Sequence, residues 1–251
     1  MLEKGNFINN RYEIISRVGA GGMSDVYKAK DHKLNRNVAI KVLKKEFSKD
    51  KNFVSKFRVE AQSAASLIHP NIVNVYDVGE DEGLYYIVME LIEGITLKSY
   101  IEKKTLSDEE KDEIVMRCAE CMKYLHNKGV IHRDFHPGNI LLGRSGKWMV
   151  TDFGLAKDVF GKYSHQTTTT QAVGRAWFTD PTQLFALKDG NFRTDMFSLA
   201  KTIDYIMDGN MSGTPHKYSS VVYKATAPNS DSRYENINEM YEDLVAIRGR
   251  L

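Results

Sequence analysis

The sequence predicts an α+β fold with two lobes, a small β-rich lobe with one helix and a larger, mainly α-helical lobe. Two observations lead to this prediction. Short runs of β-branched and aromatic residues dominate about the first ninety residues, whereas apolar residues at helical spacing dominate the rest. The pattern changes after Glu93-Gly94, so we expect one lobe over residues 1–92 and the other over 93–251.

The first lobe is expected to hold strands around one helix. Phe53, Phe57, Ala61, Ala64 and Leu67 recur at helical spacing, which predicts an amphipathic helix that ends before His69-Pro70. The expected strands cover Tyr12–Val18, Val26–Ala29, Val38–Leu43, Ile72–Val78 and Leu84–Met89.

The second lobe is expected to be helical. Ser107 and Glu110 have the Ser-x-x-Glu form of a capping box, which predicts the start of a long helix. Further helices are predicted over Phe192–Met207 and Ile237–Ile247, separated by the turn-rich stretch Gly209–Pro215.

Composition excludes several classes of protein. At 251 residues and 42% hydrophobic content the chain can bury a full core, and 35 basic against 33 acidic residues give no patch for nucleic acid or an anionic membrane. The longest stretch without Asp, Glu, Lys or Arg, Ala61–Tyr76, is too short and too polar to span a bilayer. No apolar signal core follows Met1, so we expect a cytoplasmic chain. From the balanced charge and the absence of a long apolar stretch we expect no nucleic-acid partner and no membrane segment.

The two cysteines, Cys118 and Cys121, point to a reducing compartment because they cannot form a disulfide framework. Their C-x-x-C spacing also fits a redox pair or half of a zinc site. They lie inside an apolar helical pattern, however, so we interpret them as buried core residues.

The chemistry of the chain is indicated by His132–Asn139 followed by Asp152-Phe153-Gly154. Transfer of a γ-phosphoryl group needs a carboxylate at the acceptor hydroxyl and further oxygen ligands for the metal ions that bridge the phosphates. Asp134, Asn139 and Asp152 supply these groups at the spacing that such sites use.

A second motif supports this interpretation. Gly19–Val26 lies between two predicted strands, where glycines let backbone N–H groups approach phosphate oxygens, although an unliganded hairpin turn would look the same. Lys41 follows at the distance expected of a cation over the phosphates, and Glu60 on the next helix can pair with it. A surface lysine is the alternative for Lys41.

With these motifs the chain resembles the bacterial, eukaryotic-like serine/threonine protein kinases, in order from Gly19 to Arg233. The resemblance implies the two-lobed protein kinase fold, ATP with Mg²⁺ or Mn²⁺, and protein substrates. It implies that His132, Phe153 and Asp195 support the catalytic loop, that Asn139 and Asp152 hold the metal, and that Asp134, Lys41, Glu60, His136 and Arg175 are catalytic. The implied ATP-binding residues are Val18, Gly19, Ala20, Gly21, Gly22, Met23, Ser24, Asp25, Val26, Ala39, Lys41, Met89, Glu90, Ile92 and Leu141.

Thr167, Thr168, Thr169 and Thr170 resemble the segment where this family autophosphorylates, and alignment back from Gly174 favours Thr167 and Thr169. A phosphate there could order the loop against Arg133. The resemblance further implies a transient homodimer for phosphorylation in trans. A polar loop without modification is the alternative.

The chain departs from the family pattern at four places. His136 replaces a lysine, Arg175 replaces a threonine, and Thr182 replaces a glutamate that pairs with Arg233. Asp180 is the nearest substitute for that glutamate. The segment from Asp195 to Arg233 is also short, which deletes most of the helix G region that docks protein substrates.

These departures leave alternatives open. Arg175 could supply the cation lost at His136, or it could pair with Asp134 and hold the site inactive. For the whole chain we favour an active serine/threonine kinase. A small-molecule phosphotransferase with a kinase-like fold is the second hypothesis, and a nucleotide-binding pseudokinase scaffold is the third.

Overall fold

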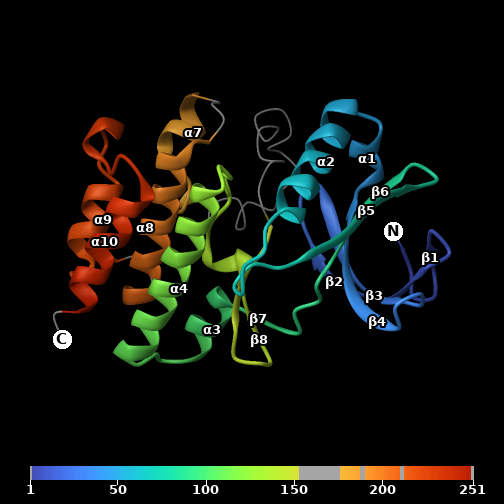
Figure 1. Ribbon diagram of the computed structural model, residues 1–251, viewed down its shortest axis with the longest axis horizontal. Coiled ribbons are helices and arrows are strands. Elements are labelled where there is room, and N and C mark those ends of the chain that lie inside the picture. The colour runs from blue at the N-terminus through green and yellow to red at the C-terminus, as the bar shows by residue number, and fades with distance from the viewer. Residues whose placement is uncertain (1, 153–175, 187–189, 210–211, 250–251) are drawn as a thin grey trace. The chain divides into compact units, whose positions relative to one another are not determined.

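The computed structural model describes residues 2–152, 176–186, 190–209 and 212–249 (Figure 1). Contacts divide the chain into two compact units: Met1–Ile68 with Val73–Glu93, and His69–Ile72 with Gly94–Leu251. The first unit is rich in strands and the second is mainly helical, so the predicted α+β class is confirmed.

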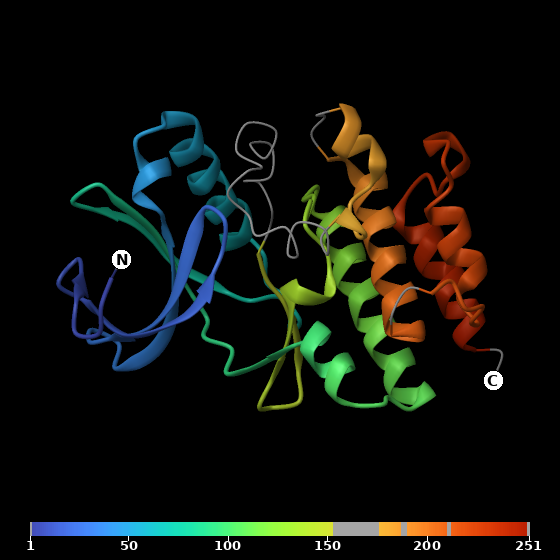
Figure 2. The same cartoon turned by 180° about the vertical axis from the view of Figure 1, so that it is seen from behind.

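The first unit is built on a six-stranded antiparallel sheet in the order β1-β2-β3-β4-β6-β5 (Figures 1 and 2). Alternating side chains of β2 and β3 are buried, as expected of a sheet with one covered face. The core includes Tyr12, Tyr27, Ile40 and Tyr86. The strands are β1 (Phe7–Ile8), β2 (Tyr12–Ala20), β3 (Ser24–Asp31), β4 (Arg36–Leu43), β5 (Val75–Asp81) and β6 (Leu84–Met89).

Two helices follow β4 in this unit. The expected helix is α2 (Lys51–Ala65), which is capped by the Asp50 side chain on the N–H of Asn52. Its apolar face buries Phe53, Phe57 and Ala61. A helix of one turn, α1 (Lys45–Ser48), precedes it and is additional to the single helix predicted.

The prediction of a strand over Ile72–Val78 was wrong at its start. The strand begins at Val75, and Ile72 instead forms an isolated parallel bridge with Val150 in the second unit. The start of this apolar run therefore pairs with Val150, and its end pairs with β6. The composition of the run does not indicate where one pairing ends and the other begins.

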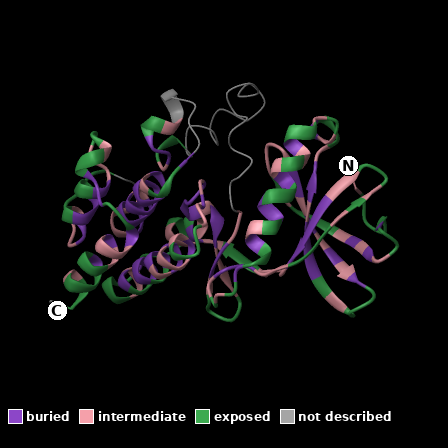
Figure 3. Cartoon of the chain, turned by 45° about the horizontal axis from the view of Figure 1, so that its top comes forward, coloured by how far each residue is buried: buried purple, intermediate pink, exposed green. Residues whose placement is uncertain are grey.

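The second unit is built around α4 (Asp108–Asn127) and α8 (Phe192–Asp208), and Figure 3 shows buried residues concentrated along its inner helices. Within α8, every residue from Thr194 to Ala200 is buried. The other described helices are α3 (Leu97–Lys103), α7 (Pro181–Ala186), α9 (Ser219–Ala225), α10 (Ile237–Arg248) and the short 3₁₀ helices η1 (Pro137–Asn139) and η4 (Ser230–Ser232). The unit also contains a three-stranded sheet of β7 (Gly94–Thr96), β8 (Ile140–Gly143) and β9 (Trp148–Val150).

The predicted start of α4 is confirmed, because Ser107 and Glu110 form both bonds of a capping box. Cys118 and Cys121 on this helix are buried and not bonded to each other. Burial raises the pKa of the Cys118 thiol to about 12, so it is protonated at neutral pH and is not a reactive thiolate. The interpretation of both as core residues is confirmed.

The connection between α8 and α9 is short, as predicted, and its described residues form no helix. Gly209 ends α8 in the left-handed conformation that glycine adopts at low cost. Polar contacts then hold the connection in place: His216 Nε2 lies 3.1 Å from Asp204 Oδ1, while Lys217 and the Tyr218 hydroxyl both bind buried Asp112.

In the part of the chain that the structure describes, no helix has the length and apolarity needed to cross a bilayer.

Candidate active site

The glycine-rich segment lies where the sequence predicts it, between two paired strands of the first unit. Val18, Gly19 and Ala20 end β2, Gly21–Met23 form the turn, and Ser24, Asp25 and Val26 begin β3. The Gly21 N–H donates to the Ser24 carbonyl at 2.8 Å and closes the turn. A Cβ on Gly21 would stand 2.9 Å from that oxygen, so the turn requires glycine.

Sheet register brings the other predicted nucleotide-binding residues of this unit close together. Val26 on β3 pairs with Lys41 on β4, and Ala39 on β4 pairs with Met89 on β6. Because β4 is central to the sheet, one strand connects the glycine-rich segment with the segment at Met89.

Lys41 and Glu60 form the predicted ion pair, with Nζ 2.6 Å from Oε1. Their side chains are only 13% and 6% exposed. Little water therefore screens the pair, and its charges interact more strongly than a surface pair would.

The segment after Met89 is fixed by Asn74, which sequence reasoning missed. The Glu90 N–H donates to the Asn74 carbonyl at 2.8 Å, and Asn74 Nδ2 donates to Glu90 Oε2 at 2.7 Å. Ile92 follows, outside any strand. Asn74 lies directly before β5, and the hairpin of β5 and β6 separates it from Glu90 in the sequence. No local sequence pattern therefore predicts this contact.

In the second unit a single buried carboxylate holds the catalytic-loop motif. Asp195 accepts hydrogen bonds from the main-chain N–H groups of His132 at 2.6 Å and Arg133 at 2.7 Å. His126 Nε2 lies 3.0 Å from the same carboxylate. His126 was not predicted; its only sequence signal is its place near the end of α4, shortly before the motif.

The loop between His132 and Asp134 is compact and strained. The Asp134 N–H donates to His132 Nδ1 at 3.2 Å, and complete burial lowers the pKa of the His132 imidazole. Arg133 has φ 66°, in the left-handed region that non-glycine residues rarely adopt. Such strain persists only where the surroundings fix it, and here the Asp195 carboxylate does so.

Asp134, Asn139 and Asp152 are linked through the main chain. Asn139 Nδ2 donates to the Asp134 carbonyl at 2.9 Å, and the Asn139 carbonyl accepts from the N–H of Thr151, next to Asp152. Asp152 has φ 60°. With its amide nitrogen engaged, Asn139 keeps its amide oxygen as an acceptor, and this oxygen and the Asp152 carboxylate are the hard donors that Mg²⁺ or Mn²⁺ prefers.

His136 lies directly beside Asp134. Its Nδ1 accepts from the Gly138 N–H at 3.0 Å, and its Nε2 lies 3.6 Å from Asp134 Oδ1. Because Nδ1 is the acceptor, the ring hydrogen is on Nε2 and faces the carboxylate. The next predicted site residue, Leu141, lies on β8.

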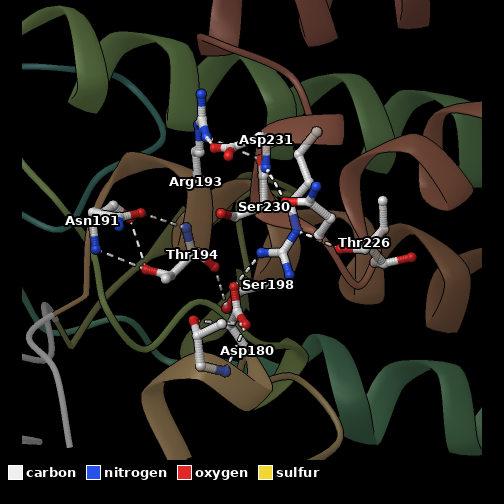
Figure 4. Close-up of polar contacts among 12 residues, drawn as sticks. Asp180, Asn191, Arg193, Thr194, Ser198, Thr226, Ser230 and Asp231 are labelled. Atoms are coloured by element: carbon white, nitrogen blue, oxygen red, sulfur yellow. Dashed lines mark hydrogen bonds and ion pairs between the residues drawn. The ribbon is translucent and has the colours of Figure 1, made fainter. Parts of the chain in front are cut away.

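The substitute predicted for the missing glutamate is confirmed. Asp180 forms an ion pair with Arg233, and the two side chains are 0% and 3% exposed. Asp180 Oδ1 also accepts hydrogen bonds from the N–H and the hydroxyl of Thr182, each at 2.9 Å. Thr182, which stands where the family has the glutamate, therefore orients the aspartate that pairs with Arg233 in its place. Figure 4 shows Asp180 among the polar side chains of this region.

Some predicted residues lie outside the described part of the chain. They are Phe153 and Gly154 of the Asp-Phe-Gly motif, Thr167–Thr170, and Arg175. Among the described residues, no group of three or more His, Cys, Asp and Glu side chains could form a metal site by itself.

Comparison with known proteins agrees with this geometry. The protein kinase domain family matches residues 12–245. The serine/threonine-protein kinase PrkC of Bacillus subtilis is 34% identical over 96% of this chain and 41% of its own length. The serine/threonine-protein kinase PknB of Mycobacterium tuberculosis is 33% identical over 96% of this chain and 43% of its own length. The chain thus spans less than half the length of these relatives.

Solved structures show the same fold. The kinase domain of Mycobacterium tuberculosis PknI, as a C20A mutant, aligns with a TM-score of 0.77 and 25% identity over 99% of this chain and 100% of that chain. Kinases of this family use ATP and a divalent metal. The chain is similar to bacterial serine/threonine kinases of eukaryotic type, and it belongs to the protein kinase domain family.

Proposed function

We propose that this chain transfers the γ-phosphoryl group of ATP to serine and threonine hydroxyls of proteins. The observation that supports this most strongly is the Asp195 carboxylate, which fixes His132 and Arg133 by their main-chain N–H groups and so presents Asp134 in a set position. Preorganised polar groups of this kind supply most of the catalysis in phosphoryl transfer.

Residues 1–92 would act as the nucleotide-binding lobe. The turn Gly21–Met23 would offer its N–H groups to the phosphates, and Lys41, held by Glu60, would neutralise their charge. Val26, Ala39 and Leu141 would supply apolar contacts to adenine. Glu90 and Ile92 would bind the adenine edge through their main chain, and Met89 would limit the depth of that site.

Residues 93–251 would carry the acceptor chemistry. Asp134 would accept a hydrogen bond from the substrate hydroxyl and take its proton as the oxygen attacks phosphorus. Asn139 and Asp152 would hold Mg²⁺ or Mn²⁺, which when bound neutralises charge on the phosphates. We propose that Arg175 supplies the cation that His136 does not, because a neutral imidazole cannot stabilise the developing charge as an ammonium would.

Regulation would act through Thr167–Thr170, with phosphorylation in trans by a second copy in a transient homodimer. A protein substrate remains the expected acceptor. One observation favours a different acceptor, a small molecule: the described residues between α8 and α9 form no helix, and in the resembling kinases this region docks protein substrates.

The test is incubation of the chain with labelled ATP and Mg²⁺, with and without a protein substrate mixture, followed by phosphosite mapping. We expect label on serine and threonine, including Thr167–Thr170, and none with Asp134→Asn. Label on added small alcohols but on no protein would support the alternative. Absence of any transfer by a chain that binds ATP would indicate a pseudokinase.

A further inference from the structure

One residue, Lys44, joins the glycine-rich turn to the end of β4. Its main-chain N–H donates to the Met23 carbonyl at 2.9 Å. Its Nζ donates to the Gly22 carbonyl, also at 2.9 Å. Its own carbonyl accepts from the Phe47 N–H at 2.9 Å at the start of α1, so Lys44 has a fixed position from which to hold the turn.

These bonds fix how the peptide groups of the turn are oriented. In a trans peptide the carbonyl and the next residue's N–H point in opposite directions. Because the Gly22 carbonyl points to the Lys44 ammonium, the Met23 N–H must point away from it. Within the described part of the chain, neither the Gly22 nor the Met23 N–H has a hydrogen-bond acceptor. The turn therefore presents the Met23 N–H on the side opposite Lys44.

Other contacts do not fix this peptide. Arg17 and Asp25 pair at 2.5 Å, but they lie on β2 and β3, at the base of the turn. The Gly21 N–H bond to Ser24 closes the turn and leaves the Gly22–Met23 peptide able to rotate. Glycine has few steric limits, so without Lys44 this peptide could present its carbonyl in place of its N–H.

We propose that Lys44 is a positioning residue for triphosphate binding, which holds the Gly22 carbonyl so that the turn offers N–H groups to a nucleotide's phosphates. This rests on the proposed function, because it takes the turn to be the phosphate-binding loop. It adds a second lysine with a different role: Lys41 would contact phosphate, whereas Lys44 acts through the backbone.

The chain allows a clean test. Lys44→Met removes the ammonium but keeps the main-chain N–H that binds Met23. Lys45→Met is the matched control, because Lys45 is the next residue, is exposed, and forms no side-chain hydrogen bond or ion pair among the described residues. Lys44→Arg keeps a cationic donor. For each variant, the dissociation constants of Mg²⁺-ATP and of adenosine are measured by calorimetric titration of the intact chain.

We expect Lys44→Met to weaken ATP binding about tenfold, the effect of losing one hydrogen bond from a charged group, and to leave adenosine binding unchanged. Lys44→Arg should recover most of the affinity, and Lys45→Met should match the wild type.

Unchanged ATP affinity in Lys44→Met would overturn the inference while leaving the proposed function intact. An equal loss for ATP and adenosine would overturn it as well, because general damage to the unit would explain both. A wild-type chain that binds no ATP would overturn the proposed function and this inference with it.

Discussion

The candidate site residues of the first unit and those of the second unit are held in different ways. In the first unit, Lys41 is fixed by a contact between side chains, its 2.6 Å ion pair with Glu60. In the second, the loop that carries Asp134 is fixed through its main chain by the buried carboxylate of Asp195. An ion pair between two side chains can break and re-form without unfolding a helix. A buried carboxylate that binds two backbone groups cannot be removed without disturbing the loop itself.

This difference leads to an expectation. Changes to the buried carboxylates of the second unit should lower the free energy of unfolding and activity together. Changes to the Lys41–Glu60 pair should affect activity more than they affect the free energy of unfolding.

The largest stability effect is expected for Asp180→Ala. It would leave the Arg233 guanidinium buried without its carboxylate, which costs about 3–5 kcal/mol of unfolding free energy. Urea unfolding measures this. Asp231→Ala is the control, because Asp231 is 82% exposed and its 2.8 Å pair with Arg193 should contribute under about 1 kcal/mol. Equal midpoints for the two variants would show that the buried pair does not stabilise this unit.

A loss of comparable size is expected for Asp195→Ala. The N–H groups of His132 and Arg133 would lose their acceptor, at about 1–3 kcal/mol for each buried group. Phosphoryl transfer should fall with stability. Asp208→Ala, at the other end of α8, is the control, since Asp208 accepts hydrogen bonds from Ser212, Gly213 and Thr214, which follow α8 and lie away from the loop that carries Asp134. Full activity in Asp195→Ala would mean that the catalytic loop is held by other contacts.

The second half of the comparison is tested by Glu60→Gln, which keeps the shape of the side chain and removes its charge. We expect the rate of transfer to fall about 10- to 100-fold, because Lys41 loses its orientation. The unfolding free energy should fall by less than in Asp195→Ala, because the amide oxygen of Gln can still accept a hydrogen bond from Lys41, whose side chain is 13% exposed. Glu80→Gln, which breaks the exposed pair with Arg58 in the same unit, should change neither quantity. Destabilisation by Glu60→Gln as large as that of Asp195→Ala would end the distinction between the two units.

The smallest effect concerns pH. Burial lowers the pKa of His132, so below the usual histidine pKa of about 6.5 the unfolded chain binds a proton that the folded chain does not. Stability from this group is therefore present above about pH 6.5 and is lost as pH falls toward the lowered value, by at most about 1.4 kcal/mol per pH unit. His69, whose pKa burial also lowers, acts in the same direction. In His132→Phe the slope of unfolding free energy against pH should be shallower between pH 7 and 5. An unchanged slope would show that His132 does not contribute to it.

The candidate site residues that lie in motifs of fixed spacing could be predicted from the sequence. The residues that position them through hydrogen bonds were predicted less well. Lys41 and Glu60 could be found because each lies in a regular element with a recognisable pattern, and the structure pairs them. Asp180 could be predicted as the partner of Arg233 because a buried guanidinium requires a carboxylate and no closer one was present.

Asn74, His126 and Lys44 could not be found in this way. Each makes its contact across a hairpin or between separate elements, through a polar side chain with no periodic signal. The strand start at Val75 was missed for a related reason, because Ile72 bonds with a distant segment rather than with its neighbours in the sheet.

We propose that Asp134 acts on the acceptor hydroxyl and not on the nucleotide. The decisive measurement compares ATP affinity with single-turnover phosphoryl transfer in Asp134→Asn, with Lys41→Met in parallel. We predict that Asp134→Asn lowers the rate about 10²- to 10⁴-fold with ATP affinity within about threefold of the wild type, whereas Lys41→Met weakens both. Full transfer by Asp134→Asn would show that the Asp134 carboxylate does not act on the acceptor hydroxyl.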